Sequence, residues 1–209
     1  PCDLEDFIRG FAIGEGIVDS ARSIFDIDRE FGEVGVAVNA TVSNETAHRL
    51  KSRRRSMAGP SGCGLCGIES IEHMTRDIVP LQAANLPSQA ALDSALSGMR
   101  HRQVVSQSTS GAHAAVWCDM DGNIVSLRED VGRHNALDKL IGWHSSELAE
   151  GFVLVSSRAS YEMVAKAATA GIGVLAAVSA PTSMAIETAK TANLKLIAFA
   201  SNGRHALYS

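Results

Sequence analysis

The sequence predicts an α/β protein, because short apolar runs alternate with helical patterns toward its carboxyl terminus. Residues 152–155, 173–178 and 194–199 have the length and apolar character of buried strands, and 161–170 and 182–191 between them have helical spacing. Strands joined through helices in this way run parallel, with right-handed crossovers. We therefore expect a β-α-β-α-β unit as the framework of the fold.

The first part of the chain predicts two helices and a strand. Residues 3–13 predict a helix with one apolar face, made by Leu4, Phe7, Ile8 and Phe11. Valines alternate with other residues over 34–38, as in a strand with one buried face. A second helix is expected over 44–55, with Asn44 as its N-cap.

A poorly patterned stretch through Pro80 and Pro87 marks a predicted domain boundary. It divides the chain into a small α+β domain, 1–85, and a larger α/β domain, 86–209. Ser88 is the expected N-cap of the next helix, whose apolar positions are Ala91, Leu92, Ala95, Leu96 and Met99.

A β-hairpin is predicted in the middle of the larger domain. The polar segment 106–111 leads into a strand over 112–118, and Asp121-Gly122 is a strong hairpin signal. The returning strand is expected over 124–127. A helix then opens within 129–135 and continues through the following leucines.

Bulk composition excludes several classes of protein. The chain has 209 residues and a net charge of -4, which argues against a nucleic-acid-binding protein. Its apolar runs are too short to cross a bilayer, and its four cysteines are too sparse for a disulfide scaffold. We expect a cytoplasmic protein with no membrane or nucleic-acid partner. Because it begins at Pro1 without a methionine, we expect the small domain to lack an upstream segment.

The run Gly62-Cys63-Gly64-Leu65-Cys66-Gly67 predicts a loop with reactive thiols, since the glycines leave little steric cover over the sulfurs. The basic run 51–55 just upstream favours thiolate if it folds back over the loop. Alternatively, these cations serve the helix dipole. No second cysteine pair accompanies the first, which disfavours a structural zinc site, and glycine after each cysteine disfavours a thioredoxin-like helix start.

A ligand site is predicted beyond the carboxyl ends of the parallel strands. Three polar loops, 156–160, 179–182 and 200–204, meet there, and the first two run into helix N-termini, which favour anions. Arg158 and Arg204 add charge suited to phosphate. The plainer alternative is that these are ordinary capping and turn residues.

The segment 130–135 is a second candidate site. Arg133 and His134 are suited to phosphate contact or proton transfer, whereas Asp130 or Asn135 alternatively caps the helix and leaves His134 exposed. His113 lies within an apolar strand and is expected to be a core histidine.

Three motifs resemble those of the formate dehydrogenase accessory protein family FdhD: GCGLCG at 62–67, EDVGRHNALDK at 129–139 and VSSRASYEM at 155–163. Residues 3–6 and 14–17 also resemble that family's early helix, so the resemblance covers nearly the whole chain. It implies a cytidine deaminase-like fold for 86–209. The zinc signature of the deaminases is absent from the sequence, so deamination is not expected.

The resemblance also implies a sulfurtransferase. A cysteine desulfurase would load a persulfide onto Cys63, with Cys66 as an assisting thiol. The sulfur would then pass to the molybdenum bis(molybdopterin guanine dinucleotide) cofactor, which GDP would mimic, before that cofactor enters formate dehydrogenase. A homodimer is implied as well. The candidate cofactor-binding residues are Phe199, Ala200, Ser201, Asn202, Gly203, Arg204, Ser156, Ser157, Arg158, Arg133 and His134.

Two other functions fit the same residues. A cofactor chaperone would deliver the molybdenum cofactor without covalent sulfur chemistry. A thiol-disulfide oxidoreductase would cycle a Cys63–Cys66 disulfide during turnover.

Overall fold

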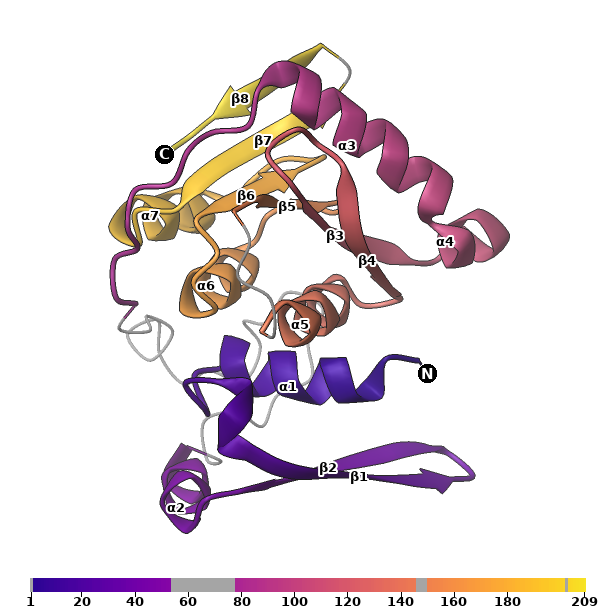
Figure 1. Cartoon of the computed structure of the whole chain (residues 1–209), viewed down its shortest axis with the longest axis vertical. Coiled ribbons are helices and arrows are strands. Elements are labelled where there is room, and N and C mark those ends of the chain that lie inside the picture. The colour runs from indigo at the N-terminus through magenta and orange to yellow at the C-terminus, as the bar shows by residue number, and fades with distance from the viewer. Residues whose placement is uncertain (1, 54–77, 146–149, 202) are drawn as a thin grey trace.

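A six-stranded mixed sheet is the centre of the fold, with strand order β4-β3-β5-β6-β7-β8 (Figure 1). The structure is a computed structural model that describes residues 2–53, 78–145, 150–201 and 203–209. The strands of this sheet are β3 (His113–Cys118), β4 (Ile124–Asp130), β5 (Phe152–Val155), β6 (Val174–Ala177), β7 (Lys195–Ser201) and β8 (Arg204–Leu207).

The predicted β-α-β-α-β unit is confirmed. Strands β5, β6 and β7 are parallel, and helices α6 (Tyr161–Thr169) and α7 (Ser183–Thr191) connect them. Every residue of β5 and β6 is buried, as the unbroken apolar runs predict for strands covered on both faces. Thr182 begins α7 as its N-cap and accepts a hydrogen bond from Ala185 N at 3.2 Å.

The two faces of the sheet are covered by different helices. Val153 and Val155 of β5 pack in one cluster with residues of α1 (Leu4–Gly14), α5 (Arg133–His144), α6 and α7. Phe152 and Leu154 point to the other face and pack with α3 (Gln89–Arg102). The alternation within a single strand therefore divides the core into two layers.

Helix α3 matches its sequence prediction. Ser88 Oγ accepts from Ala91 N at 3.1 Å, and the expected apolar face is buried against the sheet. The predicted hairpin is also confirmed, because β3 and β4 pair antiparallel and Gly122 takes a left-handed φ of 86° in the turn.

Helix α1 packs on α5 through a glycine on each helix. A side chain at Gly10 would overlap the backbone carbonyl of Asp138, and one at Gly142 would overlap that of Asp6. The two backbones are therefore in direct contact at this crossing. Ile13 and Val18 extend the same core, so the first residues of the chain pack against the larger domain; the predicted boundary at 85 stays a prediction.

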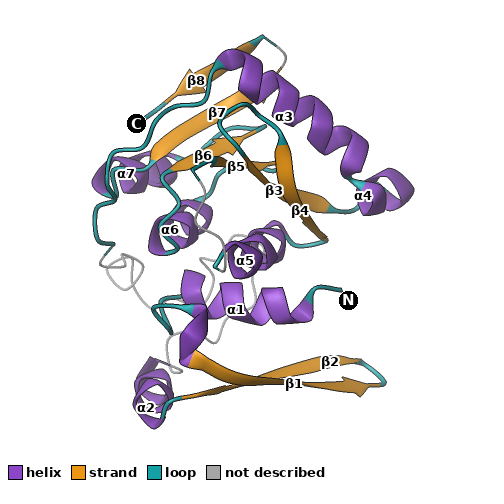
Figure 2. Cartoon of the chain, viewed as in Figure 1, coloured by secondary structure: helices purple, strands orange, loops and turns teal. Residues whose placement is uncertain are grey.

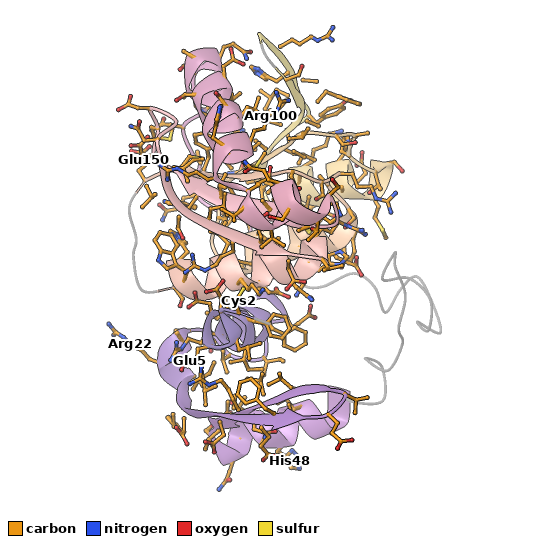
Figure 3. The ribbon with its side chains drawn as sticks, turned by 90° about the vertical axis from the view of Figure 1, so that its right-hand side faces the viewer. Cys2, Glu5, Arg22, His48, Arg100 and Glu150 are labelled. Atoms are coloured by element: carbon orange, nitrogen blue, oxygen red, sulfur yellow. The ribbon has the colours of Figure 1, made fainter. Side chains whose placement is uncertain are left out.

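A separate hairpin of β1 (Ile24–Gly32) and β2 (Gly35–Val42) lies beyond α1 with helix α2 (Asn44–Arg53), as both views show (Figures 1 and 3). The sequence predicted β2 but missed β1. It also placed the N-cap of α2 at Asn44, which is wrong: Ser43 Oγ accepts from Thr46 N at 3.2 Å and does the capping.

Three further expectations are corrected. The segment 106–111, predicted as a polar connector, overlaps helix α4 (Val104–Thr109). Strand β4 continues to Asp130, so Glu129 and Asp130 belong to a strand and not to the opening of α5. In the segment 200–204, expected as a loop, Ala200 and Ser201 are the end of β7 and Arg204 begins β8, an edge strand of the sheet (Figure 2). In the described ranges, no helix is long and apolar enough to span a bilayer.

Candidate functional site

The three polar segments predicted to meet do lie together, at the carboxyl ends of β5, β6 and β7, which we call the rim. Backbone hydrogen bonds join them: Ser179 N donates to Ser157 O at 3.4 Å, and Phe199 N donates to Ser179 O at 3.3 Å. Thr182 N also donates to Ala159 O at 3.0 Å. The loops after β5 and β6 and the end of β7 are thus joined into one continuous surface.

The segment after β4 reaches the same rim. Strand β3 pairs antiparallel with β5, so its first residues lie beside the end of β5. Ala114 N donates to Ser156 Oγ at 2.9 Å and fixes that contact. Helix α5 begins next to α6, and His134 Nε2 lies 2.9 Å from Glu162 Oε2 and 3.5 Å from Ser160 Oγ. The motif at 129–139 and the motif at 155–163 therefore lie in one cluster.

The acidic residues of this segment have structural partners. Glu129 accepts from the backbone nitrogens of Val105 and Ser106, both at 2.9 Å, and so caps α4. Asp130 accepts from Gly132 N at 2.9 Å and pairs with Lys139 Nζ at 2.8 Å. Burial of Asp130 opposes ionisation, but these bonds outweigh it and hold the pKa of its carboxyl below the usual range.

Arg133 and His134 are the residues of the segment that lie at the rim and carry cationic or titratable groups. Both are half-buried. His113, expected in the core, is also only half-buried and lies at the start of β3. Burial, followed by the neighbouring charges of Arg133 and His134, lowers the pKa of His113. Three cationic or titratable side chains therefore lie near one another at this end of the rim, and the carboxylate of Glu162 faces one of them, His134.

The other end of the rim is an open hollow of about 450 Å³, lined by Val178, Phe199, Ser201, Arg204, His205 and Ala206. Phe199 has a left-handed φ of 53°, where the pairing of β7 with β8 shifts register, and its side chain is 47% exposed. Such a backbone is costly for a bulky residue and is commonly retained at functional sites. The hollow combines an aromatic face with an arginine.

The remaining predicted site residues fall in different places. Arg158 is exposed on the first loop, whereas Ser157 is buried and donates from Oγ to Arg158 O at 3.0 Å. Ala200 is buried in β7, and Gly203 forms the turn. Cys63, Cys66 and Asn202 lie outside the described residues.

Sequence reasoning missed two residues at the rim. Glu162 lies in the first turn of α6 and His205 on β8, and neither position carries a periodic signal of function.

Of the cysteines other than Cys63 and Cys66, Cys118 is buried, which raises the pKa of its thiol to about 12 and makes it unreactive. Within the described ranges, no group of three or more His, Cys, Asp or Glu side chains is placed to hold a metal ion.

Comparison with known proteins places this arrangement in a family. The chain matches the family model described as "FdhD/NarQ family" over residues 1–209. It is 47% identical to the "Sulfur carrier protein FdhD" of Cupriavidus necator over 212 residues, covering 100% of this chain and 74% of that protein. It is 46% identical to the protein of the same description from Bordetella petrii over 213 residues, covering 100% and 76%.

A solved structure has the same fold. The crystal structure of a protein described as a formate dehydrogenase accessory protein from Desulfotalea psychrophila superposes with a TM-score of 0.72 at 24% identity, covering 100% of this chain and 77% of that one. The family match spans the whole chain, and the sequence identities are well above the level at which membership is in question. The chain belongs to the FdhD/NarQ family.

Proposed function

We propose that this protein is a sulfur carrier that transfers sulfur to the molybdenum bis(molybdopterin guanine dinucleotide) cofactor required by formate dehydrogenase. Its relatives are named as sulfur carrier proteins, which supports the transfer role. The observation that carries the cofactor assignment is the rim, where groups suited to anions and an aromatic side chain line one continuous surface with an open hollow. A dinucleotide presents this chemistry in its phosphates and bases.

Cys63 is the proposed sulfur-carrying residue. Its thiolate attacks the terminal sulfur of a persulfide held by a cysteine desulfurase, forming a new sulfur–sulfur bond as the donor's bond breaks. The donor leaves as a thiolate, and Cys63 becomes a persulfide with no net oxidation. Cys66 is assigned an assisting role.

The cofactor, as substrate, would be bound by the rim residues. Arg204 and Ser201 in the hollow, together with Arg133 and His134 at the other end, are the groups suited to phosphate.

We also propose that the protein acts in the cytoplasm as a homodimer and that residues 86–209 have a cytidine deaminase-like fold.

Intact-mass measurement tests the transfer. After incubation with cysteine and a cysteine desulfurase, the protein should gain the mass of one sulfur atom, and a thiol reductant should remove it. Cys63→Ala should gain nothing, whereas Cys66→Ala should still be loaded.

The alternatives give different results in this experiment and in a formate dehydrogenase maturation assay. A wild-type protein that never gains sulfur but binds the cofactor would be a chaperone. Equal loss of formate dehydrogenase maturation in Cys63→Ser and Cys66→Ser, with a cycling disulfide, would indicate a thiol-disulfide oxidoreductase.

A further inference from the structure

The turn between β7 and β8 is tied to helix α3 by a chain of hydrogen bonds. Gly203 N donates to Asp93 Oδ1 at 3.0 Å, and Gln89 Nε2 donates to the same oxygen at 3.0 Å. Gln89 Oε1 in turn lies 2.6 Å from Nδ1 of His205. Gln89 and Asp93 are four residues apart on α3, so their side chains share one face of the helix.

Only one placement of the hydrogen atoms satisfies this series of hydrogen bonds. The ionised carboxylate of Asp93 accepts and cannot donate, so the atom of Gln89 that faces it is the amide nitrogen. The amide oxygen of Gln89 therefore faces His205, and Nδ1 of His205 must carry a hydrogen. In the neutral ring Nε2 is then an acceptor, and in the imidazolium it is a second donor.

His205 lines the hollow at the rim together with Arg204, Ser201 and Phe199. The described residues supply no hydrogen-bond partner for its Nε2. The charged residues of the elements around the ring are Arg204, which precedes His205 on β8 and also lines the hollow, and Asp93 of α3, which is joined to the ring through Gln89. The residues that β7 contributes to the hollow, Phe199 and Ser201, carry no charge.

We propose that His205 is a binding residue of the hollow, donating from Nε2 as an imidazolium to the diphosphate of a nucleotide ligand beside Arg204. This inference rests on the proposed function. Because Nδ1 already carries its hydrogen toward Gln89, Nε2 can donate only when the ring also holds a second proton, so protonation and binding of the diphosphate are linked. Gln89 and Asp93 are positioning residues that orient the ring and hold the turn.

Isothermal titration calorimetry with GDP at about pH 6 and about pH 8, in buffers of different ionisation enthalpy, measures this linkage. The wild type should take up protons on binding. His205→Gln should take up fewer and bind about tenfold more weakly at the lower pH, the size of one lost charge-assisted hydrogen bond. Because the terminal phosphate of GDP titrates in the same range, the variant, which binds the same ligand, gives the baseline.

Two further variants complete the test. His101→Gln is the matched control and should behave as the wild type. His101 is an exposed histidine on α3, and its Nδ1 likewise has a hydrogen-bond partner, Ser97 O at 2.7 Å. Gln89→Ala removes the acceptor for Nδ1 of His205 and should reduce proton uptake on binding, although Arg204 is still present in this variant. His205 is exposed on an edge strand, so its variant should keep the wild-type melting temperature.

The outcomes separate the two proposals. Equal proton uptake by the wild type and His205→Gln, with GDP bound by both, would overturn the role of His205 and leave the nucleotide site standing. A wild type that binds no GDP at either pH would overturn the nucleotide site and this inference with it.

Discussion

Lys166 Nζ lies 2.8 Å from Asp138 Oδ1 and joins α6 to α5 in the buried layer beneath the rim. The same ammonium lies 2.8 Å from Glu15 Oε1 and 5.0 Å from the centre of the Phe11 ring. One buried cation therefore ties three helices together. Since α5 and α6 carry rim residues in their first turns, this contact joins two of the helices that present the rim.

Replacing Lys166 with methionine should destabilise the protein strongly. Lys166→Met removes the ammonium from the buried carboxylate of Asp138 and from the partly buried carboxylate of Glu15, and breaking a buried pair in this way typically costs about 3–5 kcal/mol of unfolding free energy. Urea unfolding at neutral pH measures it. Lys190→Met is the control, because the exposed Lys190–Glu187 pair at 3.4 Å should contribute less than about 1 kcal/mol. Similar losses in both variants would contradict this role of Lys166.

The protonation of Asp138 should make stability depend on pH. Burial raises the pKa of Asp138 from 3.8 to about 6, despite the attraction of Lys166. Between these values the folded protein keeps a proton that the unfolded chain releases, so the contribution of Asp138 to stability falls as the pH rises and is constant above about 6.

Comparison with Asp138→Asn isolates this contribution. The unfolding free energy of the wild type minus that of the variant should be smaller at about pH 7 than at about pH 4, as measured by denaturant titration. A difference that grows with pH would show that the pair with Lys166 outweighs burial.

Sequence reasoning predicted the elements whose signals are local. The buried strands β5 and β6 are short unbroken apolar runs, and α3 carries its own cap and periodic apolar face. Helix α4 was missed because its cap is Glu129, a residue distant in sequence. Strand β1 was missed because both its faces are largely exposed, which leaves little apolar patterning to detect.

For the candidate site, the sequence predicts where the polar loops lie but not the contacts that their side chains make. Topology alone places the ends of three parallel strands at one edge, so the meeting of the polar loops follows from the pattern of elements. The contacts that give the rim its chemistry do not follow from it. The pairing of His134 with Glu162, and of Asp93 with Gly203, depends on how helices pack on the sheet.

The crossing of α1 and α5 should not tolerate a methyl group. Gly142→Ala would place its Cβ within the backbone of α1 at Asp6, so the helices must separate, at a cost of about 1–3 kcal/mol or more. Gly35→Ala is a suitable control, since nothing lies within 4 Å of a side chain added there. Thermal unfolding of the two variants measures the difference, and equal melting temperatures would contradict the close approach.

Phe199 should affect ligand binding and contribute only modestly to the stability of the fold. Phe199→Gly relieves a left-handed backbone, worth about 1–2 kcal/mol, but adds chain entropy to the unfolded state, worth about 0.5–1 kcal/mol. The ring is 47% exposed, so the loss of its buried half costs roughly 2 kcal/mol, and we expect a net fall in the unfolding free energy of about 1–2 kcal/mol. Stacking of a base on an aromatic ring contributes about 1–3 kcal/mol, so affinity for GDP should fall about tenfold or more in calorimetry. Phe31→Ala removes a more exposed ring, 74% against 47%, from the distant β1–β2 hairpin and should leave GDP binding unchanged. If Phe199→Gly binds GDP as the wild type does, the ring is not part of the nucleotide site.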